Sequence, residues 1–246
     1  MLPYWEWGLD IKNPAASPLF DGSDTSLGGD GKKINHLPIP LSQPGVPDTI
    51  TIPPGTGGGC VYSGPFANMV VHLGPVALPQ YGSTNFTSAA NPLADNPRCL
   101  KRDLNGAVAA KYSSFVNTTR LVANYDTVEL FQAYLQGDTR YVIGSLGPHG
   151  GGHYTIGGDP GGDPFISPGD PAFYPHHGQV DRLYWIWQML DFPNRQGVFG
   201  TGTFLDQPPS PNVTVNDVID ISPLNGPVKI KDLMSTVGGP FCYVYL

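Results

Sequence analysis

Glycine and proline are so frequent in this chain that they limit how far any helix or strand can run. There are 32 glycines and 27 prolines among 246 residues, close to the share at which a chain without periodic repeats is suspected of disorder. Disordered chains, however, are poor in aromatic residues and rich in charge. Here 11% of the residues are aromatic and only 13% are charged, so we expect an ordered, loop-rich globular protein.

Length and charge narrow the class of protein further. A chain of 246 residues can bury a sizeable core and is short for two domains, so we predict one domain over residues 1–246. With 13 Lys and Arg against 20 Asp and Glu, the net charge is −7. Binding to nucleic acid needs clustered cations, so it is disfavoured. No apolar run approaches the roughly 20 residues of a membrane span, and we expect none.

Several features point outside the cytosol. Asn85, Asn117 and Asn212 each stand in an N-x-S/T sequon, which marks candidate glycosylation sites in secreted proteins. Lysine is also sparse. The first residues have neither a basic nor an apolar stretch, so they do not form a signal peptide. We predict a secreted glycoprotein whose signal peptide is not in this chain.

The cysteines are odd in number: Cys60, Cys99 and Cys242. In a secreted chain an odd count indicates a free thiol or an absent partner, while three buried, reduced thiols are the alternative. We predict a disulfide between Cys99 and Cys242, with Cys60 left without a partner that lay upstream.

Helical patterns occur in two parts of the chain. Residues 104–136 end in an apolar stripe that follows a capping box at Asp126–Glu129 and stops at Gly137. The stronger pattern starts at Asp170, a favoured N-cap residue, and continues to about residue 190. Pro175 should kink that helix or break its first turn.

The remainder of the chain carries weaker patterns. Residues 1–100 are predicted to be mostly loop, and residues 203–246 alternate short apolar runs with turns, as in strands. The glycine-rich stretch 157–162 lacks the features of a phosphate-binding loop, so we interpret it as a surface loop.

Four of the six histidines are concentrated between residues 149 and 177. His149 and His153 have the spacing that puts two side chains on one side of a helical turn, although the three glycines between them would need support from packing or a bound ion. His177 has Asp181 four residues later. We predict that His149, His153 and His177 bind one metal ion, and neutral imidazoles suit Cu, Zn, Ni or Fe.

His176 points about 100° away from His177 on a helix. We therefore place His176 and Asp181 behind the three ligands. There they would orient the ligand side chains or form part of the pocket wall. The alternative is a chance histidine pair and a His-His dipeptide that merely caps a helix.

At these residues the sequence resembles the tyrosinase and catechol oxidase family, whose active site is a coupled pair of copper ions. The second copper site of that family has two histidines four apart and then the pattern D-P-x-F-x-x-H-H-x-x-x-D-R, which occurs here at residues 170–182. Residues 3–7, P-Y-W-E-W, resemble the segment that follows the first copper site, and Tyr243-x-Tyr245 resembles the closing tyrosine motif. Short secreted fungal members are the most similar.

The resemblance implies a mainly α fold with long loops, a truncated helical-bundle core of the type-3 copper kind and short peripheral β strands. It implies copper as the cofactor, a small phenol and O₂ as reactants, and oxidation of o-diphenols to o-quinones, with monophenols left open. Gly150 and Tyr154, each following a ligand, would line the substrate entrance.

Two departures from the family pattern matter. The histidines of the first copper site should precede residue 3, so the chain resembles the C-terminal part of the copper-binding domain, with at most one copper site and incomplete activity alone. His36 and His72 have no family counterpart and are not assigned as ligands. Gly150 stands where monophenol-hydroxylating members have an Asn that orients a water, which favours diphenol oxidation; Glu129 is a candidate for the carboxylate that helps to hold that water.

Three other functions remain open. A hemocyanin-like O₂-binding protein would use the same copper chemistry behind a closed pocket. An inactive, truncated remnant would bind one metal ion without catalysis, and a mononuclear zinc hydrolase would use the same histidines.

Overall fold

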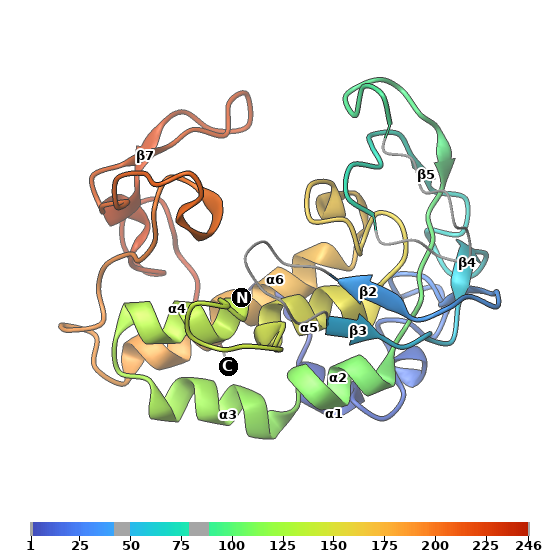
Figure 1. Ribbon diagram of the computed structural model, residues 1–246, viewed down its shortest axis with the longest axis horizontal. Helices are drawn as coiled ribbons and strands as arrows, with labels where there is room; N and C mark the ends of the chain where they lie inside the picture. The colour runs from blue at the N-terminus through green and yellow to red at the C-terminus, as the bar shows by residue number, and fades with distance from the viewer. Residues whose placement is uncertain (1, 42–49, 79–88, 246) are drawn as a thin grey trace.

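The computed structural model describes residues 2–41, 50–78 and 89–245 of the chain. Within these ranges the regular structure is mainly helical (Figure 1). The α-helices are α1 Trp7–Asp10, α2 Gly106–Tyr112, α3 Phe115–Asn124, α4 Val128–Gln136, α5 Gly147–Ile156 and α6 Phe173–Met189. Short 3-10 helices cover Pro14–Ala16, Ser167–Gly169, Phe204–Asp206 and Ile230–Leu233.

The described strands are short and pair only into two-stranded antiparallel ribbons. The pairs are β1 Gly31–Lys33 with β4 Gly58–Val61, β2 Ile39–Leu41 with β3 Ile50–Ile52, β5 Val70–Val71 with β6 Arg98–Cys99, and β7 Val218–Ile219 with β8 Val228–Lys229. The mainly helical fold with long loops and short strands at the periphery is thus confirmed. Within residues 203–245 the strand prediction holds only for β7 and β8.

Helices α5 and α6 lie in the middle of the molecule, with the β2–β3 ribbon beside α5 and the segment after residue 200 on the opposite side (Figure 1). The main core joins α6 to helices earlier in the chain through buried aromatic and aliphatic side chains. It includes Trp5, Trp7, Phe20, Leu104, Leu121, Phe131, Leu135, Ile156, Ala172, Leu183 and Trp187. Because both helices are packed on this core, the side chains that they carry are held in fixed places.

Helix boundaries follow local capping. Thr127, rather than Asp126, caps α4, and its hydroxyl accepts a hydrogen bond from the backbone N–H of Leu130. Gly137 ends that helix with a φ of 65°, as predicted. Helix α6 begins at Phe173 instead of directly after Asp170, so Pro175 occupies the first turn, where no intrahelical N–H is needed.

The Asp170 carboxylate accepts a hydrogen bond from the backbone N–H of Ala172, just before α6, and it has a second partner as well. It forms an ion pair with Arg102, and both side chains are fully buried. The same guanidinium donates to the backbone carbonyls of Gly28 and Gly29. The pair therefore ties the start of α6 to the segment before α2 and to the N-terminal loops.

The disulfide prediction is wrong: Cys99 bonds to Cys60, and Cys242 is a free, exposed thiol. Cys60 lies in β4, which runs beside the chain that follows β6, as the bridge between Cys60 and Lys101 records. This pairing brings the two cysteine Cα atoms to 5.7 Å, within the usual range for a disulfide. Cys60 therefore has its partner within the chain.

The glycine-rich stretch 157–162 is not a surface loop either, because all of its residues are buried. Asp159 exchanges two backbone hydrogen bonds with Lys101. A Cβ atom on Gly158 would come within 2.1 Å of the Lys101 carbonyl oxygen. The glycines are thus needed where two backbone segments approach closely in the interior.

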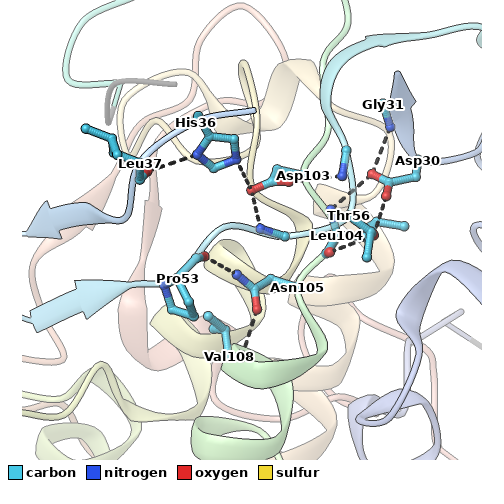
Figure 2. A network of polar contacts seen from close by, with 12 residues as sticks. Asp30, Gly31, His36, Leu37, Pro53, Thr56, Asp103, Leu104, Asn105 and Val108 are labelled. Atoms are coloured by element: carbon cyan, nitrogen blue, oxygen red, sulfur yellow. Dashed lines mark hydrogen bonds and ion pairs between the residues drawn. The ribbon is translucent and has the colours of Figure 1, made fainter. Parts of the chain in front are cut away.

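A buried polar network joins the loops around β1 to β4 to the start of α2 (Figure 2). Asp103 accepts hydrogen bonds from the N–H groups of Gly55 and Gly57. It also pairs with Nε2 of His36 at 3.1 Å, and both side chains are nearly fully buried. Asn105 caps α2 at Val108 and donates to the Pro53 carbonyl. His36 is therefore a structural residue in this network.

Candidate metal centre

Helices α5 and α6 bring four histidines together: His149, His153, His176 and His177. One nitrogen from each lies within 4.8 Å of those of the others. In the described part of the chain this is the one group of three or more potential ligand residues that meets in this way. The spacing of these histidines in the sequence predicted that they lie on two nearby elements.

The glycines of α5 allow this close approach. A Cβ on Gly151 would come within 2.5 Å of Cβ of Tyr112 in α2, and a Cβ on Gly152 would come within 2.3 Å of the His176 ring. Poor helix formers are therefore tolerated because packing of α5 against its neighbours supplies the support.

Three of the imidazoles point their Nε2 atoms at one another. Nε2 of His153 lies 3.2 Å from Nε2 of both His149 and His177, and the third separation is 3.4 Å. Each neutral imidazole offers one Nε2 atom to the triangle, and that atom is either a donor or an acceptor. Three hydrogen bonds therefore cannot form among the three Nε2 atoms. The arrangement is instead that of a donor set around a cation.

The triangle has the right size for a first-row metal ion. Imidazole nitrogen binds zinc at about 2.0–2.1 Å, and tetrahedral angles at that distance put neighbouring nitrogens about 3.3–3.4 Å apart. The measured separations of 3.2–3.4 Å match this value. Copper accepts the same nitrogen ligands, so the residues fit the copper ion that the sequence pattern implies.

The histidines are held neutral, as ligands must be. Burial, followed by the neighbouring His153 and His177, lowers the pKa of His149 to about 3. Burial and His177 lower the pKa of His153 to about 4. Burial also lowers the pKa of His177.

Three supporting residues are not evident from sequence spacing. The amide oxygen of Gln136, at the end of α4, lies 2.6 Å from Nδ1 of His149, so the proton sits on Nδ1 and Nε2 is left to bind a metal. His153 forms a hydrogen bond with the backbone of Gly161, which partly opposes the lowering of its pKa. The ring of Phe173 stacks on His177 with centroids 4.0 Å apart. Only Phe173 belongs to the recognised pattern, and no residue type marks the other two.

His176 lies behind the other three histidines. Its side chain is fully buried, its ring is parallel to that of His149 at 5.5 Å, and it packs against Trp7 at 5.3 Å. Neither of its nitrogens has a hydrogen-bond partner in the part of the chain that is described. Burial lowers its pKa well below the ordinary value, so it is a neutral ring in the wall of the site.

Asp181 contacts the end of the chain. The hydroxyls of Tyr243 and Tyr245 donate to its Oδ2 atom at 2.8 and 2.6 Å. The hydrogen bonds of Asp181 in the described residues thus come from the closing tyrosines and not from His177. The carboxylate fixes the C-terminal segment to α6.

The predicted pocket residues share one side of α5. A Cβ on Gly150 would meet Cβ of Leu146 at 3.2 Å, and Tyr154 packs at the edge of the cluster of Ile39, Ile50, Ile52, Val108, Tyr112 and Leu146. Burial raises the pKa of Tyr154 to about 12. Both positions therefore lie toward the β2–β3 ribbon.

The remaining candidates lie elsewhere. His72 is exposed and pairs with Asp95. Glu129 accepts a hydrogen bond from Tyr141 on the surface.

Of the sequons, Asn212 is exposed, whereas Asn117 is partly buried and its amide donates to the Lys111 carbonyl. Asn85 lies outside the described residues. None of the described helices is both long enough and apolar enough to cross a bilayer.

Comparison with known families gives a match over most of the chain. A family model described as the common central domain of tyrosinase matches residues 1–190. Tyrosinase P from Aspergillus terreus is 42% identical over 247 residues, covering 99% of this chain and 67% of that protein. An N-acetyl-6-hydroxytryptophan oxidase from Emericella nidulans is 34% identical, covering 99% of this chain and 68% of that protein.

A solved structure is also similar. A polyphenol oxidase variant from Thermothelomyces thermophila aligns with a TM-score of 0.88 at 41% identity, covering the whole of this chain and 66% of that one. The chain thus spans about two thirds of the length of these relatives.

Proposed function

This chain belongs to the tyrosinase family of oxidoreductases, and from that premise we propose that it binds copper through His149, His153 and His177 and serves the oxidation of o-diphenols by O₂. The observation that carries the proposal is the triangle of three Nε2 atoms at 3.2–3.4 Å. When bound, copper would pass electrons from the phenol to O₂. Each catechol gives up two electrons and two protons and becomes an o-quinone, so two catechols reduce one O₂ to two waters.

The contribution of the protein is to fix the ligands and to shape the approach to them. Gln136 holds the proton on Nδ1 of His149, and Phe173 holds the ring of His177 in place. Burial keeps the rings neutral, so no proton has to leave before a cation binds. Gly150 has no side chain that could hold a water to accept a phenol proton, which favours diphenols over monophenols.

We further propose that residues 1–246 form the part of a tyrosinase copper-binding domain that carries the second copper site. Among the described residues, the one group of three or more potential ligands that meets is the cluster of four histidines, and coupled two-copper chemistry requires a second ligand set. Full activity would then need a first copper site that these residues do not supply.

Two features of the structure bear on where in or outside the cell the protein is found. The Cys60–Cys99 disulfide is typical of an oxidising environment, and Asn212 is exposed as a glycan acceptor must be. We therefore propose a secreted glycoprotein.

An assay of quinone formation tests the function. The copper-loaded product of the complete reading frame and residues 1–246 alone are supplied with 4-methylcatechol and O₂, and quinone absorbance and O₂ consumption are followed. We expect turnover by the former, its loss in His177→Ala, and little change in the matched control His72→Ala. Reversible O₂ binding without quinone would instead identify an O₂ carrier.

A further inference from the structure

A cavity of about 320 Å³ lies among α2, α3, α4 and the start of α5. Its volume is at the lower end of the range typical of small-molecule sites. None of the four clustered histidines lines it. Two cationic side chains and three tyrosines do line it, and none of its described lining residues is acidic.

Neither of the two cations, Lys111 and Arg120, forms an ion pair within the described residues. Four other arginines each pair with a carboxylate: Arg98, Arg102, Arg140 and Arg182. Lys111 places its Nζ 4.9 Å from the ring centroid of Tyr112. The cavity therefore has two positive charges available to an anion.

One wall of the cavity is a rigid aromatic pair. The rings of Tyr125 and Tyr134 stack with centroids 4.1 Å apart, and the Tyr125 carbonyl accepts a hydrogen bond from the fully buried Trp187. The pKa of Tyr125 is raised, mainly by burial and by Tyr134, and the charge of Arg120 opposes that rise. The Arg120 guanidinium is thus close enough to affect Tyr125 electrostatically. The aromatic ring of a ligand could pack beside the Tyr125–Tyr134 pair.

Tyr112 supplies a third feature. It is only 6% exposed, and its hydroxyl has no hydrogen-bond partner in the described structure. A buried hydroxyl without a partner costs free energy. A polar ligand atom bound in the cavity would be available to satisfy it.

We propose that this cavity binds a small aromatic carboxylate, with the carboxylate between Lys111 and Arg120 and the ring against the Tyr125–Tyr134 pair. Two cations without acidic partners select the anion, and the stacked tyrosines select a planar ring over a saturated or purely inorganic one. The site is separate from the metal centre, and its existence does not depend on the proposed oxidase function.

Calorimetric titration of the metal-free protein with 4-hydroxybenzoate tests the proposal. Without copper, a carboxylate has no metal to bind, so the heat reports on sites other than the metal centre. We expect one equivalent to bind. The dissociation constant should rise about tenfold in Arg120→Gln and in Lys111→Gln, and it should be unchanged in the matched surface control Lys33→Gln. All three side chains are exposed, so the variants should melt like the parent protein.

Two further probes separate the charge from the ring. Phenol lacks the carboxylate and inorganic phosphate lacks the ring, so both should bind at least about tenfold more weakly than 4-hydroxybenzoate. The proposal is overturned if either probe binds as tightly as 4-hydroxybenzoate. It is equally overturned if both charge variants leave the dissociation constant unchanged, or if 4-hydroxybenzoate binds only after copper is added.

Discussion

Glycine residues in α5 differ in what surrounds them, although all look equally unfavourable in a helix. Gly152 faces the buried His176 ring at a distance that leaves no room for a methyl group, whereas Gly150 faces the Leu146 side chain with more space. The sequence showed three adjacent glycines between two histidines, but it could not show which of them packs against a neighbour.

Replacing Gly152 and Gly150 with alanine should therefore change the stability by different amounts. Gly152→Ala should lower the free energy of unfolding by about 1–3 kcal/mol, because His176 is fixed under Trp7 and has little freedom to move. Gly150→Ala should be close to neutral, since the gain in helix propensity of roughly 1 kcal/mol offsets a tight contact. Thermal melts of the metal-free proteins measure both, and equal melting temperatures for the two variants would contradict this packing.

The histidine cluster was accessible to sequence reasoning for a physical reason. Helical periodicity fixes which residues share a side, so the spacing of His149 and His153 and the position of His177 define the proposed ligand set. Gln136 was missed because its place beside His149 arises from the packing of α4 on α5, which no local pattern encodes.

At the scale of elements, the contact between α6 and the chain end depends on protonated tyrosines. Burial, together with the hydrogen bonds to Asp181, raises the pKa values of Tyr243 and Tyr245 above the ordinary value near 10. A group whose pKa is raised on folding binds its proton more tightly in the folded state. Its stabilising effect is therefore complete below about pH 10 and is lost as the pH rises further.

We expect the C-terminal segment to detach from α6 at alkaline pH. Protease cleavage within residues 235–245 should begin to accelerate only above about pH 10 and should rise further with pH. In Tyr245→Phe cleavage should already be fast at neutral pH, since one hydrogen bond to Asp181 is absent. The exposed Tyr62→Phe serves as the control. A cleavage rate in the parent protein that does not change with pH, after correction for the protease, would rule out this contact.

Helix existence was predictable and helix boundaries were less so. The apolar stripes and Gly137 located α4 and α6, because local periodicity and capping act within a few residues. The predicted start of α6 was misplaced by two residues, although Asp170 does accept a hydrogen bond from the N–H of Ala172. The other partner of Asp170, Arg102, lies 68 positions away in the sequence. Local sequence patterns do not reveal a long-range ion pair of this kind.

On the scale of the whole molecule, the disulfide determines how the loop-rich part of the chain is held. Counting cysteines led to the wrong pairing, because pairing depends on which strands lie side by side, and β4 and β6 are too short to be recognised from their residues. The Cys60–Cys99 bond instead closes a loop across 39 positions.

Removing this bond should lower the free energy of unfolding by about 4 kcal/mol through the entropy of the unfolded chain. The measurement is denaturant unfolding of a Cys60→Ser, Cys99→Ser variant, with Cys242→Ser as the matched control that should unfold like the parent protein. Greater destabilisation by the Cys242 change than by the double change would contradict the observed pairing.

The proposed copper site requires that three imidazole nitrogens converge on one cation. X-ray absorption of the protein loaded with one equivalent of Cu(I) measures this directly. It should show three imidazole nitrogens at about 2.0 Å, falling to two in His177→Ala and remaining three in His176→Phe. A spectrum with fewer than three imidazoles in the parent protein, or one that His177→Ala leaves unchanged, would contradict the assignment.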